Sequence, residues 1–260
     1  MKHFKSWRSY ANFVNKTQYS RRFIHDKEVM EFLHTLLETS KPRVREIKKS
    51  TLLWRAQQGC EIYAARATDR ALAFEEEKPY SPKRMKPLPR QASEGRANPK
   101  GIPCLYLSTK KKTALTEVRP WMGSLITLAK FIITMDLKLV DCSMNALQKI
   151  PYYLNEPAPV QREKIVWTYI DRAFSKPIQC CDQIADYVPT QVIAEFFKAN
   201  KFDGIIYQSN FDNGQNIALF NLNVAEVQNC VVYEATKIRL NFREVSNPPR
   251  RRSIRIYPDT

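Results

Sequence analysis

Three side chains that suit the binding of a charged substrate lie close together in the sequence: Arg96, Tyr106 and Glu117. Tyr106 alternates with Leu105 and Leu107, so on an extended strand its ring points away from theirs. Glu117 falls near the end of an expected helix, where the helix dipole disfavours an acid by a few tenths of a kcal/mol. An arginine and a carboxylate can together hold an anion and stabilise a positive charge that forms on it.

Arg55 and Ser209 extend this set. Arg55 follows an apolar run, where burying an unpaired charge is costly, and Ser209 ends an apolar strand, where its hydroxyl can face a cleft. Each candidate also has an ordinary structural explanation. Arg55 can lie at a strand edge with its guanidinium in water, and Ser209 can serve a turn alone. Tyr106 can be a core residue, and Glu117 can pair with Arg119 or a nearby lysine, which contributes at most about 1 kcal/mol.

The familiar signatures of several enzyme classes are missing from the sequence. It contains no P-loop, no G-x-G-x-x-G, no H-E-x-x-H and no G-x-S-x-G motif. All three histidines precede residue 35, and His25 and His34 have no cysteine or second carboxylate placed for metal binding. We therefore expect a site without a metal, in which carboxylates, arginines and hydroxyls carry any catalysis.

The composition favours an anionic partner. Lys and Arg total 42 against 26 Asp and Glu, and the net charge of +16 suits nucleic acid, phosphate, a nucleotide or an acidic protein. The basic residues are spread along the chain except for a dense cluster over 248–255, so nucleic-acid binding is not expected except through that cluster. The six cysteines form no C-x-x-C pair, no secretory signal is evident, and the apolar runs are too short for a membrane span. These features predict a cytoplasmic protein with reduced thiols.

Hydrophobic periodicity predicts a mixture of helices and strands. Near the N-terminus we expect an amphipathic helix with Asp26 as its N-cap and an apolar stripe from Val29 to Leu37. Closely spaced prolines predict a long structured loop over 75–103. Strands are expected over 102–107, 131–135, 137–141, 204–208, 216–220, 229–233 and 237–243, with a hairpin turn at 212–214, and helices over about 109–119, 160–175 and 190–200. Because strands and helices do not alternate strictly, the pattern favours an α+β fold.

Five segments occur in an order that resembles one known family. They are Leu53–Ala56, Gly95–Leu107, Thr113–Trp121, Phe202–Ser209 and Gly214–Phe220. Together they span about residues 50–225, and several linked motifs in register are far more specific than any one of them. On these segments the chain resembles the RES family, which is named for an arginine, a glutamate and a serine.

This resemblance implies an α+β fold akin to ADP-ribosyltransferases, with NAD as the substrate. RES proteins degrade NAD by phosphorolysis, with inorganic phosphate as co-substrate, or by hydrolysis of the nicotinamide–ribose bond. Many are toxins that are held inactive by an antitoxin with a helix-turn-helix domain. By motif position, the expected catalytic residues are Arg55, Glu117 and Ser209. The expected substrate-binding residues are Arg96, Tyr106 and Asn216.

These residue types suit the implied reaction. Nicotinamide in NAD⁺ is already a cationic leaving group, so its departure needs no general acid, and a nearby carboxylate stabilises the oxocarbenium-like ribose. Glu117 is expected to have this role, while Arg55 and Arg96 bind the pyrophosphate or an attacking phosphate. Tyr106 can stack on nicotinamide or orient its ribose, and Ser209 can bond to the amide or the ribose.

Two other functions stay open on the sequence. The implied fold also suits an ADP-ribosyltransferase that modifies a protein or nucleic acid, and the +16 charge suits a non-enzymatic nucleic-acid-binding module. In domain terms we expect an N-terminal helical extension over 1–49, a catalytic domain over 50–245 and a basic tail over 246–260.

Overall fold

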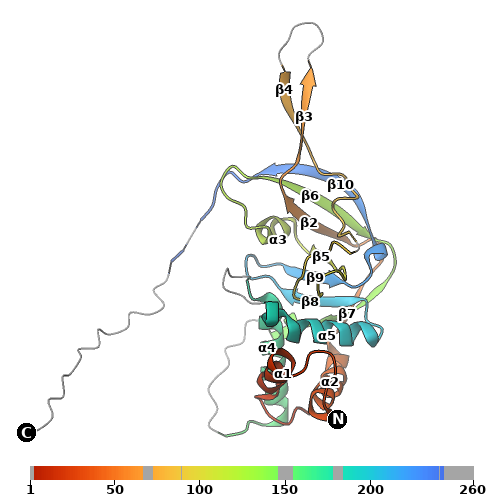
Figure 1. Ribbon diagram of the computed structural model, residues 1–260, viewed down its shortest axis with the longest axis vertical. Helices are drawn as coiled ribbons and strands as arrows, with labels where there is room; N and C mark the ends of the chain where they lie inside the picture. The colour runs from red at the N-terminus through yellow and green to blue at the C-terminus, as the bar shows by residue number, and fades with distance from the viewer. Residues whose placement is uncertain are drawn as a thin grey trace, which may run out of the picture.

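A mixed eight-stranded sheet forms the centre of the structure, a computed structural model that describes residues 3–66, 73–88, 90–145, 155–177, 184–239 and 241–242 (Figure 1). In sheet order the strands are β1 (Val44–Ile47), β7 (Leu137–Asp141), β8 (Gly204–Gln208), β9 (Gln215–Leu219), β5 (Leu105–Ser108), β2 (Leu52–Gln58), β6 (Leu125–Ile133) and β10 (Ala225–Glu234). β7 and β8 are parallel, and the other neighbouring strands are antiparallel.

The strand pairing within the sheet is shortest between β5 and β2. These two strands share a single residue pair, Trp54 with Ser108, whereas β2 pairs with β6 along its whole length and β5 does the same with β9. Side chains of β2 and β5 near this junction are therefore not covered by a continuous ladder of neighbours. The candidate site lies here.

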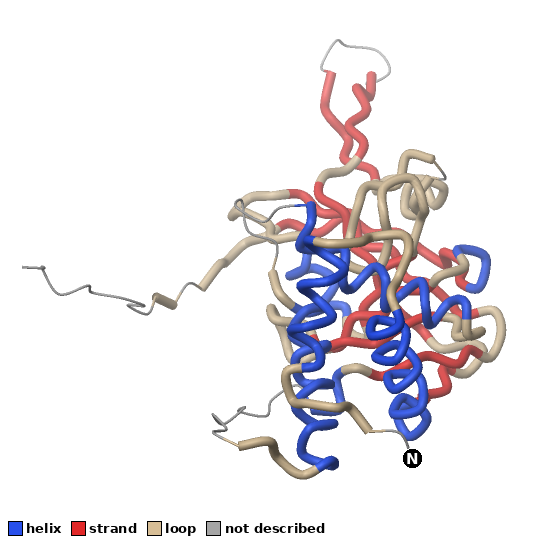
Figure 2. The backbone as a smooth tube through the Cα atoms, turned by 60° about the horizontal axis from the view of Figure 1, so that its bottom comes forward, coloured by secondary structure: helices blue, strands red, loops and turns tan. Residues whose placement is uncertain are grey.

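Four helices gather on one side of the sheet (Figures 1 and 2). They are α1 (Ser9–Tyr19), α2 (Lys27–Ser40), α4 (Pro159–Ser175) and α5 (Val188–Ala199). A further short helix, α3 (Lys111–Glu117), contacts β2, β5 and β6. Single 3₁₀ turns occur at Lys41–Arg43, Ser143–Asn145, Ile184–Tyr187 and Leu222–Val224.

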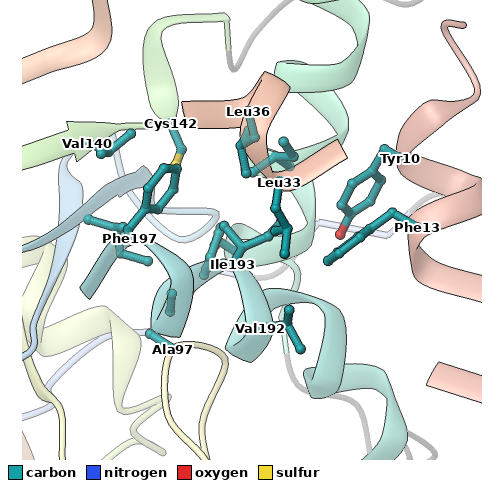
Figure 3. Packing of buried hydrophobic residues seen from close by; sticks show 14 of the residues in the cluster. Tyr10, Phe13, Leu33, Leu36, Ala97, Val140, Cys142, Val192, Ile193 and Phe197 are labelled. Carbon is teal, nitrogen blue, oxygen red and sulfur yellow. The ribbon is translucent and has the colours of Figure 1, made fainter. Parts of the chain in front are cut away.

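The helices and the sheet share one apolar core. Leu36 of α2, Ile193 of α5 and Val140 of β7 belong to the same buried cluster, part of which is drawn in Figure 3. Successive strand residues face opposite sides, as the period of two requires: Ile205 joins this cluster, and Ile206 joins a second cluster on the other face. The segment predicted as an N-terminal extension thus contributes both to the main core and, through β1, to the sheet. Its boundary at residue 49 stays a prediction.

A two-stranded hairpin, β3 (Glu61–Arg66) with β4 (Ala73–Lys78), projects from the body of the molecule (Figure 1). Its antiparallel register pairs Glu61 with Lys78 and Tyr63 with Glu76. The predicted loop over 75–103 was therefore wrong at its start, because residues 75–78 belong to β4. The segment is polar, so its composition gave no indication of a strand, but its residues pair with β3.

Most of the other predicted elements are confirmed, including the mixed α+β architecture. Asp26 caps α2, and its Oδ1 accepts a hydrogen bond from the backbone N–H of Val29 at 2.9 Å. The helices predicted at 160–175 and 190–200 are α4 and α5, and the predicted hairpin is formed by β8 and β9. Helix α1 was not predicted, because its apolar residues are few and follow a weak periodicity.

The strand predicted over 237–243 was wrong in the part that the structure describes. β10 ends at Glu234, opposite Leu125, where its partner strand begins, so residues 237–239 and 241–242 have no ladder to join. The predicted basic tail over 246–260 lies outside the described residues, as do Cys180 and Cys181.

Cys60, Cys104, Cys142 and Cys230 are free thiols. Over the described ranges, no helix combines the length and apolar character that crossing a bilayer requires.

Candidate active site

The carboxylate of Glu117 is the centre of a hydrogen-bonded cluster at the end of α3. Its Oε1 accepts two hydrogen bonds of 2.6 Å, one from the Ser209 hydroxyl and one from Asn216 Nδ2. Within the described part of the chain, no hydrogen bond ends on Oε2. Glu117 is half-buried, so two donors fix the carboxylate while one oxygen stays available to a ligand.

The turn between β8 and β9 positions Ser209. The Ser209 N–H donates to the Gly214 carbonyl at 3.1 Å, and the Ser209 hydroxyl accepts from the N–H of Phe211 at 3.1 Å. Gly214 packs so tightly on α3 that a Cβ there would overlap Oγ1 of Thr113. The same Thr113 hydroxyl donates to Asp212 at 2.8 Å. These contacts tie the turn to α3 and hold Ser209 beside the carboxylate.

Asn216 is oriented by its neighbour on β5. The Ser108 hydroxyl donates to Asn216 Oδ1 at 2.8 Å, and the two residues are directly paired in the β5–β9 register. With Oδ1 occupied, the amide N–H₂ points at Glu117. Both Ser108 and Asn216 are buried, so this chain of polar side chains has the low-dielectric surroundings that strengthen hydrogen bonds.

Arg55 lies in the middle of β2 with few hydrogen-bond partners. Its Nη1 donates to the Tyr106 carbonyl at 3.2 Å, and its buried Nε has no hydrogen-bond partner among the described residues. Burial lowers the pKa of the Arg55 guanidinium from its ordinary value, although an arginine stays charged in proteins. An incompletely paired, largely buried cation beside a pocket is suited to binding an anion.

Arg96 is held on a loop that packs against α4. Its Nε donates to the carbonyl of Lys176, the residue after the last turn of α4, at 2.9 Å, where the helix dipole favours a positive charge. The Arg96 guanidinium carbon also lies 5.0 Å from the ring centroid of Tyr187. Ala97 is buried in the main core, which anchors the loop next to the arginine (Figure 3).

Tyr106 supports this loop through its hydroxyl. The hydroxyl donates to Asn98 Oδ1 at 2.7 Å and accepts from the N–H of Ala97 at 2.9 Å. A Cβ on Gly95 would lie 2.6 Å from the same hydroxyl oxygen, so a glycine is needed there. Burial raises the pKa of Tyr106 well above its usual range, which keeps the hydroxyl neutral.

These side chains meet at a pocket of about 470 Å³ beside the β2–β5 junction. Of the residues expected from the sequence, Arg55, Arg96, Tyr106, Glu117 and Asn216 line it. Aromatic surface is added by Trp54, Phe174, Tyr207 and Phe211. Ser209 is 5% exposed and does not line this pocket, so it contributes through its bond to Glu117. The pocket thus presents two carboxylates, three arginines, a lysine and several aromatic rings.

Comparison with known proteins agrees with the motifs. A family model for the RES domain matches residues 52–243. The chain belongs to the RES family. Among solved structures, it is similar to a chain in the crystal structure of the M. tuberculosis MbcT–MbcA toxin–antitoxin complex, with 15% identity, a TM-score of 0.38 and coverage of 77% of this chain and 92% of that chain. No curated protein matches the chain.

In this RES protein the structural alternatives for two candidates do not apply. Glu117 bonds to Ser209 and Asn216 rather than to a neighbouring lysine or Arg119. Arg55 is not at an edge, because β2 lies between β5 and β6. Ser209 does serve its turn, but the same hydroxyl also bonds to Glu117. Glu117 and Arg55 line one pocket, and Ser209 bonds to Glu117 from outside it, whereas the catalytic roles of all three stay predictions.

Three residues that sequence reasoning missed hold the RES pocket in shape. Ser108 orients Asn216, and Asn98 accepts a hydrogen bond from the Tyr106 hydroxyl. Gln191 of α5 donates a hydrogen bond to the loop that carries Arg96. Asn98 and its loop fall within a segment that resembles the family, which was a usable signal. Gln191 gave no signal, because it reaches a loop almost a hundred residues earlier in the chain.

No group of three or more His, Cys, Asp or Glu side chains in the described ranges is arranged to hold a metal ion. The expectation that this RES site works without a metal stays a prediction.

A buried acid behind the RES site predicts a dependence of stability on pH. Burial raises the pKa of Asp171 to about 6, and Asp141 adds to this, while the N–H of Gln208, Arg172 and Arg43 oppose it. Because the usual value is about 4, the folded state keeps a proton that the unfolded chain releases between pH 4 and 6. The contribution of Asp171 to stability therefore falls as pH rises through that window.

We expect Asp171→Asn to remove this loss, because an amide keeps an acceptor for the Gln208 N–H, which lies 3.1 Å from Asp171 Oδ1. At pH 7 the variant should be more stable than wild type by on the order of 2 kcal/mol, and the difference should vanish near pH 4. Urea unfolding at a series of pH values is the measurement. Curves that run parallel from pH 4 to 7 would show that Asp171 does not titrate in this range.

Proposed function

We propose that this RES protein degrades NAD by cleaving the bond between nicotinamide and ribose. The observation that carries the proposal is the Glu117 carboxylate. Ser209 and Asn216 donate hydrogen bonds to its Oε1, while its Oε2 accepts no hydrogen bond from the described residues. It lines the same pocket as Arg55 and Arg96. A fixed carboxylate in a pocket whose cationic side chains outnumber its acidic ones matches a substrate that is anionic at its pyrophosphate and becomes cationic at one ribose.

In this proposal the arginines bind the dinucleotide. Arg55 and Arg96 hold the pyrophosphate by charge-assisted hydrogen bonds, each of which contributes roughly 1.5–3 kcal/mol when shielded from water. The aromatic side chains that line the pocket provide flat apolar surface for the rings of the substrate. The Tyr106 ring is part of this surface. Its hydroxyl is already hydrogen-bonded to Asn98 and Ala97, so the ring is the part that we expect to contact the substrate.

The bond-breaking step uses Glu117. The C1′–N bond breaks and its electron pair goes to the nicotinamide nitrogen, which becomes neutral, so no proton is needed for departure. Positive charge builds on C1′ and the ring oxygen of the ribose, and Glu117 Oε2 stabilises it electrostatically. An oxygen of phosphate or of water then bonds to C1′, and the water route releases a proton. Ser209 and Asn216 keep the carboxylate in place throughout.

We propose further that this activity makes the protein a cytoplasmic toxin, restrained by an antitoxin with a helix-turn-helix domain. Membership of the RES family supports this proposal. A toxin that acts through NAD should arrest the growth of a bacterial host, and growth equal to that of cells without the protein would contradict it. The basic tail, the one segment through which nucleic-acid contact was considered, lies outside the described residues.

The proposed activity is tested by incubating the purified protein with NAD, with and without inorganic phosphate, and measuring released nicotinamide. We expect release in at least one buffer. Dependence on phosphate indicates phosphorolysis, and release without it indicates hydrolysis. NAD labelled in its ADP-ribose half should leave its label in small products. Label on a macromolecule would favour an ADP-ribosyltransferase instead, and no nicotinamide in either buffer would refute NAD cleavage.

A further inference from the structure

A second carboxylate, Glu94, lines the pocket two residues before Arg96, and the reaction proposed above does not use it. Its Oε1 accepts a hydrogen bond from Gln191 Nε2 at 2.9 Å. Its Oε2 has no hydrogen bond from any residue that the structure describes. Glu94 therefore resembles Glu117 in one respect: one oxygen is fixed by the protein, and the other is available.

The contact that fixes Glu94 comes from a buried, hydrogen-bonded residue of α5. Gln191 is 7% exposed on α5, and its Nε2 also lies 3.0 Å from the Gly95 carbonyl and 3.1 Å from the Asn98 carbonyl. One buried amide thus holds both the loop backbone and the Glu94 side chain. Glu117 is held by a different element, the β8–β9 turn. The two carboxylates are consequently set by separate walls and suited to separate parts of a long ligand.

The position of Glu94 beside Arg96 restricts what its free oxygen can bind. If Arg96 holds a phosphate group, the neighbouring carboxylate repels any further phosphate and accepts hydrogen bonds from neutral donors. On a dinucleotide, the neutral donors next to the pyrophosphate are ribose hydroxyls. Glu117 takes the nicotinamide ribose in the proposed reaction, which leaves the adenosine ribose for Glu94.

We propose that Glu94 accepts a hydrogen bond from a hydroxyl of the adenosine ribose and thereby selects NAD over NADP. NADP carries a phosphate on the 2′-oxygen of that ribose, which would place a dianion against the carboxylate. An acidic residue on the 2′-hydroxyl is a general means of choosing NAD, and it works by repelling the competitor as well as by binding the substrate. This inference rests on the proposed function and names the substrate class more narrowly.

Other charges of the pocket act in the opposite direction. Arg119 and Lys176 also line it and would attract an additional phosphate. The preference of the wild type for NAD or NADP therefore reflects all of these charges. The role of Glu94 is measured by how much this preference changes when the Glu94 charge is removed. Removing one negative charge next to the adenosine ribose should shift the preference towards NADP.

The test compares wild type with Glu94→Gln, which keeps the size and one acceptor oxygen. Nicotinamide release gives kcat/KM for NAD and for NADP, and the ratio of NADP to NAD should rise about 10-fold in the variant, with KM for NAD increased. Glu226→Gln, on the exposed side of β10, is the matched control and should leave the ratio unchanged. A ratio for Glu94→Gln within about twofold of wild type would overturn the inference.

Calorimetric binding of NAD and NADP to both proteins makes the inference independent of turnover. Should wild type release no nicotinamide, NAD cleavage fails, but a shift of about 10-fold in the binding ratio still supports the role of Glu94. An unchanged binding ratio, or no binding of either dinucleotide, refutes it. Turnover of NAD with an unchanged ratio refutes the role of Glu94 alone and leaves the proposed function in place.

Discussion

Replacing Glu117 with glutamine should lower kcat for nicotinamide release by about 1,000-fold, the effect seen when one electrostatic stabiliser is removed from an active site. The side-chain oxygen of glutamine can still accept from Ser209 and Asn216, so the cluster around residue 117 is kept. What is lost is the negative charge that balances the positive charge on the ribose. KM for NAD should change little, because that charge develops after binding. Initial rates over a range of NAD concentrations provide both constants.

Two controls separate the loss of charge from a loss of fold. Glu226→Gln removes an exposed acid from β10 and should retain wild-type rates. Thermal unfolding of Glu117→Gln should lie within a few degrees of wild type. If kcat of the folded Glu117→Gln protein falls less than about threefold, Glu117 is not the stabilising group. The same variant should also fail to arrest growth when it is expressed in a bacterial host.

Arg55→Met should raise KM for NAD by roughly 10- to 100-fold, the value of one or two charge-assisted hydrogen bonds. The same change should not destabilise the protein. Arg55 Nε is buried without a partner in the described residues, so its desolvation is uncompensated in the free protein. Methionine fills similar volume without that penalty, although the hydrogen bond from Nη1 to the Tyr106 carbonyl is lost. A loss of binding without a loss of stability is the signature of a residue kept for its ligand.

Steady-state kinetics and urea unfolding measure these two effects on the same preparation. Arg21→Met is the matched control, because Arg21 is exposed and far along the chain from the pocket residues. It removes an equal charge and should change neither KM nor stability. An Arg55→Met protein with wild-type KM would exclude a role for this arginine in binding. A protein that is less stable by several kcal/mol would show that Arg55 is structural.

The residues of the site were predictable because local chemistry marked them. Arg55 in an apolar run and Glu117 at the wrong end of a helix each conflict with local rules, and such conflicts concentrate at functional sites. Their order along the chain matched the RES family, and the structure brings both to one pocket. Ser209 was also found, but its relation to Glu117 was not, because residues 92 apart in sequence give no local sign of a hydrogen bond.

The supporting parts of the fold were less predictable for a physical reason. Gln191 lies on a helix face where a glutamine is unremarkable, and its role depends on the loop at 94–98 folding back onto α5. The short pairing of β5 with β2, a single residue pair, is likewise a matter of which strands become neighbours, which periodicity does not record. Hydrophobic patterns predict which face of an element is buried. They do not predict which polar groups meet across the core.

A structure of the Glu117→Gln protein with NAD bound tests the central claim most directly. NAD should occupy the pocket at the β2–β5 junction, with its pyrophosphate on Arg55 and Arg96 and with C1′ of the nicotinamide ribose about 3–4 Å from the side chain of residue 117. NAD bound elsewhere, or turned so that its nicotinamide ribose lies far from residue 117, would contradict the account.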